Sequence, residues 1–287
     1  MNTYRLFRVV ATVLPRIAPL RARQRLAVAA NRVGGRLGPA LVLALLHDWA
    51  TRAPDEFHHF QWSNHLGYSR HYDTTQIDVE TLHPLRLELF ELALTTLRDA
   101  GVDPAKDIDA FLDIGCSLGY VARYAETTAF PAAGRIVGID IDRAALDDGR
   151  SYLARVGSRT ELMEGNAAHL DDLFGDATFD VVFACGVVPY FEEQSATAFV
   201  EACLRHTSRV FCVNGHADSQ VDNRELASSR PRHQDHSFVH NLDRMILAAG
   251  GRILARRWGG AEQIGGNSVY FVIAEPGRAV ADTTPTT

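Results

Sequence analysis

The residues between Phe111 and Gly119 combine an apolar run, a carboxylate and two glycines at short spacing. The run FLDIG is typical of a strand that ends near Asp113 and turns at Gly115, before a helix begins close to Gly119. Such a turn lets backbone N–H groups and a helix N-terminus face a ligand that lies across the strand ends. About twenty residues beyond the turn, the run RIVGID ends in Asp140, where a carboxylate can accept hydrogen bonds from ribose hydroxyls. The pattern therefore predicts a binding site for a ligand that contains a ribose.

The spacing of the glycines separates two classes of such ligand. A dinucleotide site requires G-x-G-x-x-G, but Ser117 and Tyr120 stand where the second and third glycines belong. Their side chains would block the close approach of a pyrophosphate, which disfavours an NAD oxidoreductase. The observed pattern, D-x-G-x-S-x-G, resembles motif I of the class I S-adenosylmethionine (SAM)-dependent methyltransferases, D/E-x-G-x-G-x-G, with Ser117 in place of the middle glycine.

Further stretches resemble the same family in the same order, and together the resemblance covers residues 108–275. It implies that Asp140 holds the ribose and that Asn166 and Ala167 lie against the adenine, where the family usually has Asp-Ala. The run FDVVF resembles the fourth strand of the family, and the residues after it resemble the following loop. The cofactor implied is SAM, and the residues implied to bind it are Asp113, Gly115, Cys116, Gly119, Asp140, Ile141, Asn166, Ala167, Cys185 and Gly186. We expect Asp142 to cap the next helix instead.

Methyl transfer from a sulfonium is an in-line displacement, so positioning of the nucleophile is a large part of catalysis. A hydroxyl or ammonium acceptor must also lose a proton, for which histidine is a suitable base. Histidines gather in residues 57–73 and again between residues 216 and 240. His216, which directly follows a predicted strand, and His65 are the two candidate bases.

We expect residues 57–73 and 216–236 to face each other across the acceptor pocket and to exclude water from it. Segments before the first strand commonly fold over SAM in the family, so Tyr68 and Tyr72 are expected to contact the cofactor. The alternative is that these aromatic residues belong to a core. His236 and His240 lie four residues apart at a predicted helix start, a spacing that can chelate a metal. No carboxylate completes a ligand set, so no metal is expected.

The pattern along the chain predicts the elements that position these residues. Residues 1–105 have helical periodicity and are expected to form a helical N-terminal region that caps the active site. Residues 106–276 alternate short apolar runs with helical segments, which indicates a catalytic domain with a Rossmann-like α/β sheet. We expect seven strands, mostly parallel with an antiparallel last strand, at residues 110–114, 135–140, 160–164, 179–184, 209–214, 252–258 and 268–274. Residues 277–287 are predicted to be a disordered tail.

Composition excludes several classes of function. The net charge of −6 argues against nucleic acid as a partner, and no apolar run is long enough to cross a membrane. The Arg-rich N-terminus reads as an amphipathic helix that packs on the protein body or on a second subunit in a homodimer. Binding to a membrane surface is the alternative. The four cysteines form no CxxC pair, which fits a reducing cytoplasm.

These features together predict a SAM-dependent methyltransferase that acts on a small molecule, such as a specialised metabolite in natural-product biosynthesis. Two alternatives stay open. One is a SAM-binding enzyme that catalyses a cyclisation or rearrangement without methyl transfer. The other is a non-catalytic interaction protein that uses its basic N-terminus.

Overall fold

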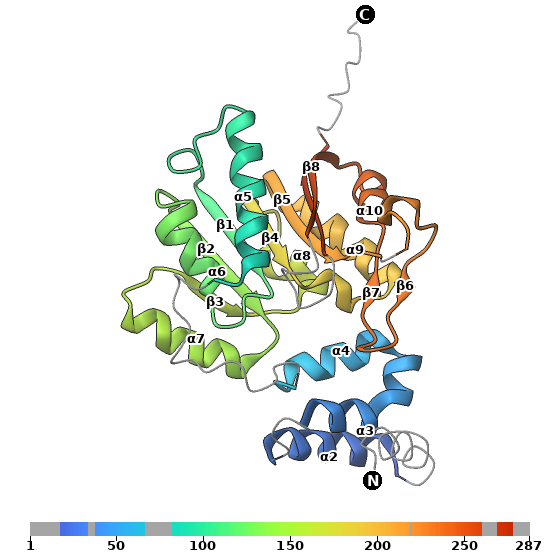
Figure 1. The fold of residues 1–287 in the computed structure, drawn as a ribbon. Coiled ribbons are helices and arrows are strands. Elements are labelled where there is room, and N and C mark those ends of the chain that lie inside the picture. Colours follow the sequence, from blue (N-terminus) through green and yellow to red (C-terminus); the bar gives the residue numbers. More distant parts are fainter. Residues whose placement is uncertain (1–17, 34–37, 67–81, 219, 260–268, 278–287) are drawn as a thin grey trace, which may run out of the picture.

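The computed structural model describes residues 18–33, 38–66, 82–218, 220–259 and 269–277. Within these ranges, seven strands form a central sheet in the order β3-β2-β1-β4-β5-β9-β8 (Figure 1). The strands are β1 (Ala110–Ile114), β2 (Arg135–Asp140), β3 (Glu161–Glu164), β4 (Phe179–Cys185), β5 (Thr207–His216), β8 (Arg252–Gly259) and β9 (Val269–Glu275). Each begins and ends within two residues of its prediction.

The pairing of the strands confirms the predicted fold. β1 pairs in parallel with β2 and β4, and β2–β3 and β4–β5 are also parallel. β9 runs antiparallel to both β5 and β8. The parallel strands therefore bring their carboxyl ends to one edge of the sheet, where ligands bind in open α/β folds.

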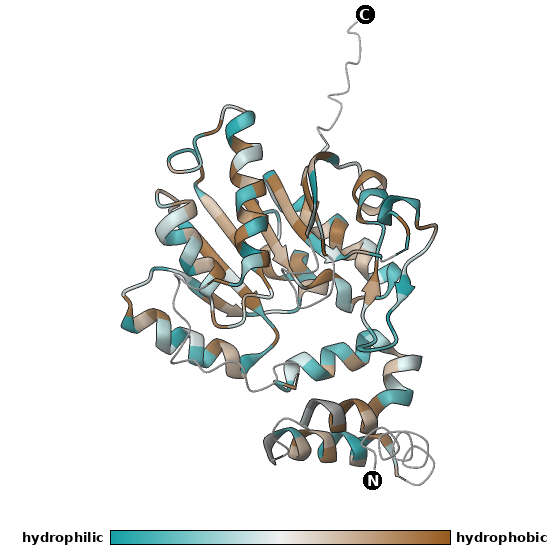
Figure 2. Ribbon diagram, viewed as in Figure 1, coloured by the Kyte–Doolittle hydropathy of each residue, from teal (hydrophilic) through white to brown (hydrophobic). Residues whose placement is uncertain are grey.

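Helices cover both faces of the sheet. Apolar residues of α5, α6 and α7 pack on one face, where Phe90 of α5 stacks on Phe183 with ring centroids 4.4 Å apart. Apolar residues of α8, α9 and α10 pack on the other, where Phe199 and Leu242 are buried. Figure 2 shows largely apolar strands between helices in which hydrophilic and hydrophobic residues alternate. These helices are α5 (Pro84–Asp99), α6 (Tyr120–Tyr124), α7 (Arg143–Arg155), α8 (Leu170–Phe174), α9 (Glu193–Arg205) and α10 (Leu242–Ala248).

Three N-terminal helices lie beyond the carboxyl edge of the sheet and are called the cap below (Figure 1). They are α2 (Leu20–Val33), α3 (Gly38–Arg52) and α4 (Pro54–Ser63). The cap has a small core of its own, which includes Leu46, Trp49 and Phe57. Helix α5, although it precedes the first strand, packs on the sheet, so among the described N-terminal helices α2–α4 form the cap. No helix among the described residues is long and apolar enough to span a membrane.

The segment after β5 differs most from its prediction. It contains a small hairpin of β6 (Arg230–Pro231) and β7 (Phe238–Val239), whose two-residue strands have no periodicity to reveal them. His236 lies in this hairpin and α10 begins only at Leu242, so the expected helix start that pairs His236 with His240 is wrong. Short turns complete the fold: the π-helical turn η3 (Ala125–Ala129) and the 3-10 turns η4 (Ala167–His169), η5 (Val188–Tyr190) and η6 (Asn223–Glu225).

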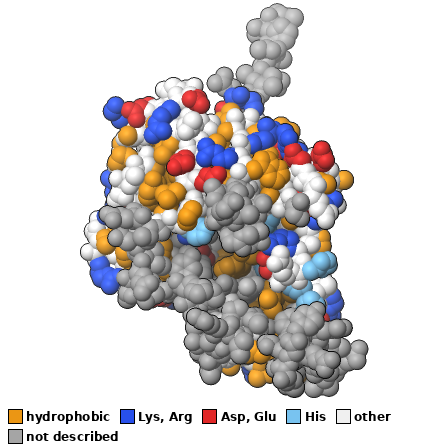
Figure 3. Space-filling model, in the orientation of Figure 1, with side chains coloured by type: hydrophobic (Ala, Val, Ile, Leu, Met, Phe, Trp, Pro, Cys, Tyr) orange, Lys and Arg blue, Asp and Glu red, His pale blue; other side chains and the backbone are white. Residues whose placement is uncertain are grey.

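The surface carries no block of one charge on the face drawn in Figure 3. Acidic and basic side chains are interspersed over the sheet domain on this face, and histidines are visible toward the cap. Among the described residues, no group of three or more His, Cys, Asp or Glu side chains is arranged to hold a metal ion.

Candidate functional site

A cavity of about 830 Å³ lies between the carboxyl ends of the strands and helix α4. On the sheet side it is bordered by the turns that follow β1, β2, β3 and β4. On the cap side it is bordered by α4 and by Trp49 of α3. Its walls include Trp49, Asp55, Glu56, His58, His59, Phe60, Trp62, Ser63, Arg86, Gly115, Ile139, Asp140, Ile141, Gly165, Asn166, Ala167, Ala168, Cys185, Gly186, Val187, Tyr190, Phe191 and Ser195.

The turn after β1 has the backbone that its glycines predict. Gly115 has φ 74°, and a Cβ there would come within 2.5 Å of Val187 Cγ2 in the turn after β4, which also lines the cavity. Any side chain at this position would therefore narrow the cavity. Ser117, at the position of the family's middle glycine, has φ 51°, which is uncommon for a residue other than glycine. Its hydroxyl is buried and has no hydrogen-bond partner among the described residues.

The backbone N–H groups of this turn bind within the protein. The amides of Gly115 and Cys116 donate to Ile139 O at 2.8 and 3.0 Å. The amide of Ser117 donates to Asp140 Oδ2 at 2.7 Å. The expectation that these amides face a ligand is therefore corrected, because their hydrogen bonds join the turn after β1 to the end of β2. The turn instead contributes to the cavity wall at Gly115.

Asp140 ends β2 at the cavity and is 8% exposed. Its two oxygens accept the backbone N–H groups of Ser117 and Asp142, the latter at 2.9 Å. The Ile141 amide also acts on this carboxylate, whose remaining lone-pair capacity is available to a ligand hydroxyl at the cavity. Burial raises the pKa of Asp140, while hydrogen bonds from the backbone oppose the shift. Asp142 accepts the Ala145 N–H and caps α7, as predicted.

Asp113 lies behind the cavity wall and is only 2% exposed. Its Oδ2 has no hydrogen-bond partner among the described residues. Burial raises the pKa of Asp113 to about 7, and the nearby positive charge of Arg86 opposes the rise. Arg86 itself lines the cavity from the first turn of α5. The positive charge of Arg86 therefore acts on the buried carboxyl of Asp113 near the end of β1.

The remaining residues implied to bind the cofactor divide into two groups. Asn166, Ala167, Cys185 and Gly186 line the cavity with Ile141. The side-chain oxygen of Asn166, expected to contact the adenine, accepts the Ala168 N–H at 2.9 Å and keeps one further lone pair. Two other residues shape the site from behind the cavity wall, namely Cys116 and Gly119. Tyr68 and Tyr72 lie outside the described residues.

Neither predicted base lines the cavity. His65 Nδ1 lies 2.6 Å from Asp142 Oδ2, and this hydrogen bond raises the pKa of the imidazole. His216 ends β5 against the guanidinium of Arg232, 2.9 Å from its Nδ1. Burial and then the charge of Arg232 lower the pKa of His216 to about 4. To act on a ligand in the cavity, each of these side chains would have to leave its present partner.

Helix α4 brings two other histidines to the cavity, His58 and His59. His58 is 2% exposed, and its Nε2 lies 3.0 Å from the carbonyl oxygen of His236 in the hairpin. His236 Nε2 also lies 3.0 Å from His47 Nδ1 in α3. The described parts of residues 57–73 and 216–236 are therefore in contact through His58 and His236. They do not face each other across the cavity, because this part of the hairpin does not line it. Across the cavity, α4 faces the strand ends, and the rings of His58 and Trp62 contact Tyr190 of η5.

Sequence reasoning did not identify Asp55, Glu56 and Arg86, which all occupy first turns of helices. Acids in a first turn are common for helix stability alone, so Asp55 and Glu56 carry no separate signal. An arginine in a first turn is opposed by the helix dipole, and this was the available signal for Arg86.

Comparison with known proteins agrees with this geometry. Residues 111–209 match the family model described as a methyltransferase domain. An S-adenosylmethionine-dependent methyltransferase from Clostridium acetobutylicum ATCC 824 superposes with a TM-score of 0.50 at 10% identity, covering 72% of this chain and 95% of that one. The [4+2]-cyclase SpnF also superposes with a TM-score of 0.50, at 15% identity, covering 66% of this chain and 81% of that one.

A magnesium protoporphyrin IX methyltransferase from Synechocystis PCC 6803 with bound SAM gives a TM-score of 0.49 at 13% identity, covering 80% of this chain and 94% of that one. No curated protein sequence matches the chain. The matched residues run from β1 into β5 and include the turn at Gly115 and the acid Asp140. Residues 111–209 thus match a methyltransferase domain, and the seven-stranded sheet has the Rossmann-like fold of SAM-dependent methyltransferases of known structure.

Proposed function

We propose that the protein transfers the methyl group of SAM to a small molecule held beneath α4, such as a specialised metabolite. One observation carries the proposal: a single cavity is bordered by the turn at Gly115 and Asp140 on one side and by α4 on the other. Its volume of about 830 Å³ is near the upper end of small-molecule sites, about 300–1,000 Å³, which leaves room for an acceptor beside a cofactor.

The residues present fit SAM. Asp140 lines the cavity and can accept a ribose hydroxyl, and Asn166 and Ala167 line it where we place the adenine. Arg86, which lines the cavity, suits the carboxylate of the methionine end, and we assign its ammonium group to Asp113, whose buried Oδ2 has no partner among the described residues. When bound, SAM supplies an electrophilic methyl group on a sulfonium. The protein then contributes by holding the acceptor in line with that methyl group and by excluding water.

If the acceptor loses a proton on methylation, a base at the cavity must take up that proton. His58 and His59 border the cavity, whereas the predicted bases His65 and His216 hold Asp142 and Arg232. Burial lowers the pKa of His58, so its imidazole is neutral at neutral pH and able to take a proton. We therefore place His58 ahead of His65 and His216 as the base.

The setting of the enzyme is also a proposal. All four cysteines are free, which supports a reducing compartment such as the cytoplasm. Leu26 on α2 is 51% exposed, and this supports a homodimer through the N-terminal helices. The mixed charges on the face in Figure 3 and the net charge of −6 support an acceptor other than nucleic acid.

Calorimetry tests the cofactor half of this proposal. SAM and S-adenosylhomocysteine (SAH) should bind with micromolar dissociation constants, about −7 to −8 kcal/mol, and NADH should not bind. Binding of NADH without binding of SAM would refute the proposal.

Product analysis tests the reaction. Incubation with methyl-labelled SAM and a library of small acceptors should move the label into a product, and replacement of SAM by SAH should stop the reaction. A product that forms equally well with SAH would instead indicate a cyclisation or rearrangement.

A further inference from the structure

Two carboxylates in the first turn of α4, Asp55 and Glu56, line the acceptor end of the cavity. Each is held in place through one oxygen. Asp55 Oδ1 accepts the backbone N–H of Glu192 at 2.6 Å, and Glu56 Oε2 accepts the indole N–H of Trp49 at 3.3 Å. Within the described chain, the second oxygen of each carboxylate accepts no hydrogen bond. Both carboxylates are thus positioned by the fold while one acceptor oxygen of each stays available.

The negative charge of this pair is not balanced within the described part of the protein. Neither Asp55 nor Glu56 forms an ion pair there, whereas Glu193 and Asp235 nearby pair with arginines, Arg244 and Arg232. The charge of Asp55 reaches its neighbour Glu192, whose pKa is raised by burial and then by Asp55. The cation that lines the cavity, Arg86, acts on Asp113 and Cys185 near the strand ends.

Aromatic rings surround the same end of the cavity. Trp49, Trp62 and Tyr190 line it together with Phe60 and Phe191. Trp62 and Tyr190 meet edge to face, with ring centroids 4.9 Å apart. Aromatic faces attract cations through their quadrupole, and recognition of ammonium groups by aromatic cages is a well-established use of this effect. Rings beside unbalanced carboxylates therefore favour a cation.

His58 adds an acceptor to this end of the cavity and no positive charge. Its Nε2 donates to the backbone oxygen of His236, so its Nδ1 is unprotonated in the neutral ring. Nδ1 is buried and has no hydrogen-bond partner among the described residues, although the ring lines the cavity. Burial lowers the pKa of His58, so the ring adds no positive charge that would repel a cation in the cavity.

We propose that the acceptor carries a basic nitrogen that is protonated in solution, and that Asp55 and Glu56 bind this ammonium group against the aromatic rings beneath α4. The proposal rests on the proposed function and names the class of its acceptor. A molecule with a carboxylate or phosphate at this end would be repelled. A neutral acceptor would leave the charge of both carboxylates without a partner in the cavity.

The test uses the full chain saturated with SAH and two probes that differ mainly in charge, 2-phenylethylamine and 3-phenylpropionate. Calorimetry at pH 7 should show that the amine binds at least about tenfold more tightly than the acid, as one charged hydrogen bond provides. The double variant Asp55→Asn, Glu56→Gln keeps the oxygens that accept from Glu192 and Trp49. It should lose this preference while its affinity for SAH stays unchanged. Asp172→Asn, an exposed carboxylate on α8, is the matched control and should keep the preference.

The outcomes separate this inference from the proposed function. If SAH binds and the two probes bind equally, or the acid binds better, the amine assignment is wrong and the methyltransferase proposal stands. If the double variant keeps the preference for the amine, Asp55 and Glu56 are not the binding groups. If the double variant loses affinity for SAH, these carboxylates hold the cofactor and not the acceptor. If the wild-type protein fails to bind SAH, both proposals fall.

Discussion

At the scale of single residues, Asp140 combines two tasks. Its oxygens accept the amides of Ser117 and Asp142, which fixes the two turns that follow β1 and β2. The same oxygens border the cavity, where we place the ribose. A residue that shapes a turn can bind a ligand without reorganisation, because its hydrogen bonds to the backbone already hold it in place.

Asp140→Asn should weaken SAH binding about 10- to 100-fold, because an amide offers one acceptor where the carboxylate offers two and carries no charge. Asparagine is preferable to alanine here, since it can still accept one of the two backbone amides. Calorimetry with SAH measures the change. Asp142→Asn is the matched control, since Asn also caps helices well and Asp142 does not line the cavity. An unchanged affinity in Asp140→Asn would remove Asp140 from the cofactor site.

The sequence locates residues at the sheet edge better than residues in the cap. Gly115 and Asp140 stand at fixed spacing from strand ends, and the strands are recognisable by their apolar runs. The cap residues Asp55, Glu56 and His58 reach the same cavity through tertiary packing of α4, which no local pattern encodes. His65 and His216 are plausible from the sequence because they sit beside the right elements. Hydrogen bonding in three dimensions then engages them elsewhere.

At the scale of elements, the motif I turn depends on helices packed closely behind it. Gly149 in α7 lies against the backbone of Leu118, and a Cβ at Gly149 would come within 2.8 Å of Leu118 O. The obstacle is backbone, so it cannot rotate away. This contact explains a glycine in the middle of a helix, where glycine is otherwise unfavourable by about 1 kcal/mol.

Gly149→Ala should therefore destabilise the protein by about 1–3 kcal/mol, although alanine is the better helix former. Urea unfolding followed by circular dichroism measures the change. Gly134→Ala provides the control, because a Cβ there meets no atom within 4 Å. A gain in stability for Gly149→Ala would show that α7 can shift away from the turn at no cost.

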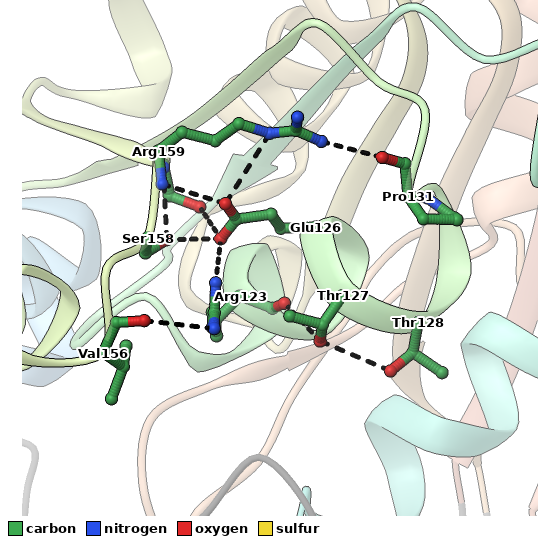
Figure 4. Close-up of polar contacts among 9 residues, drawn as sticks. Arg123, Glu126, Thr127, Thr128, Pro131, Val156, Ser158 and Arg159 are labelled. Carbon is green, nitrogen blue, oxygen red and sulfur yellow. Dashed lines mark hydrogen bonds and ion pairs between the residues drawn. The ribbon is translucent and has the colours of Figure 1, made fainter.

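A second contact between elements joins η3 to the loop before β3 (Figure 4). Glu126, 8% exposed, accepts hydrogen bonds from Arg123 at 2.7 Å, from the Arg159 amide at 2.9 Å and from the Ser158 hydroxyl. Burial tends to raise the pKa of Glu126, but these donors outweigh it and the pKa is lowered. Glu126 thus connects η3 to the loop that precedes β3.

Glu126→Ala should destabilise the protein by about 2 kcal/mol or more, because several charge-assisted hydrogen bonds are lost and buried donors stay unpaired. The loss should shrink as the pH falls through the lowered pKa, since protonation removes the same charge from the wild type. Thr128→Ala, an exposed change in the same turn, should stay within about 0.5 kcal/mol of the wild type. Equal stability of both variants in urea would contradict this account.

At the scale of the whole molecule, the cap and the sheet domain have separate apolar cores. Polar contacts join them among the described residues: His58 and His47 to His236, Asp55 to the Glu192 amide, and His65 to Asp142. The seven-stranded sheet was predictable because each strand is a local run. The docking of the cap was not, because it depends on histidines that recur too often in the sequence to be assigned in advance.

The hydrogen bonds of His47 and His58 with His236 should make the docking of the cap sensitive to pH. Burial lowers the pKa of His236 to about 4; repulsion from His47, His58 and His233 acts in the same direction, and Asp235 opposes it. Burial also lowers the pKa of His58, with Asp235 and Asp55 opposing. A histidine whose pKa is lowered in the docked cap binds fewer protons there than when the cap is undocked. Their stabilisation is therefore complete above about pH 6.5 and is lost as the pH falls toward about 4. His65 works in the opposite sense, because Asp142 raises its pKa.

Hydrogen exchange of α4 measures this dependence. Between pH 7.5 and pH 5, exchange of the α4 amides, corrected for its intrinsic pH dependence, should accelerate about tenfold, the factor that corresponds to one pKa unit. In His236→Asn the acceleration should be smaller, because asparagine tolerates the positive φ of 60° at this position but does not titrate. His169→Asn, an exposed histidine of the sheet domain, should behave like the wild type. If α4 exchanges equally fast at both pH values, or if His236→Asn leaves the acceleration intact, the histidine contacts do not control docking. The apolar contacts around Phe57 and Tyr190 would then hold the cap by themselves.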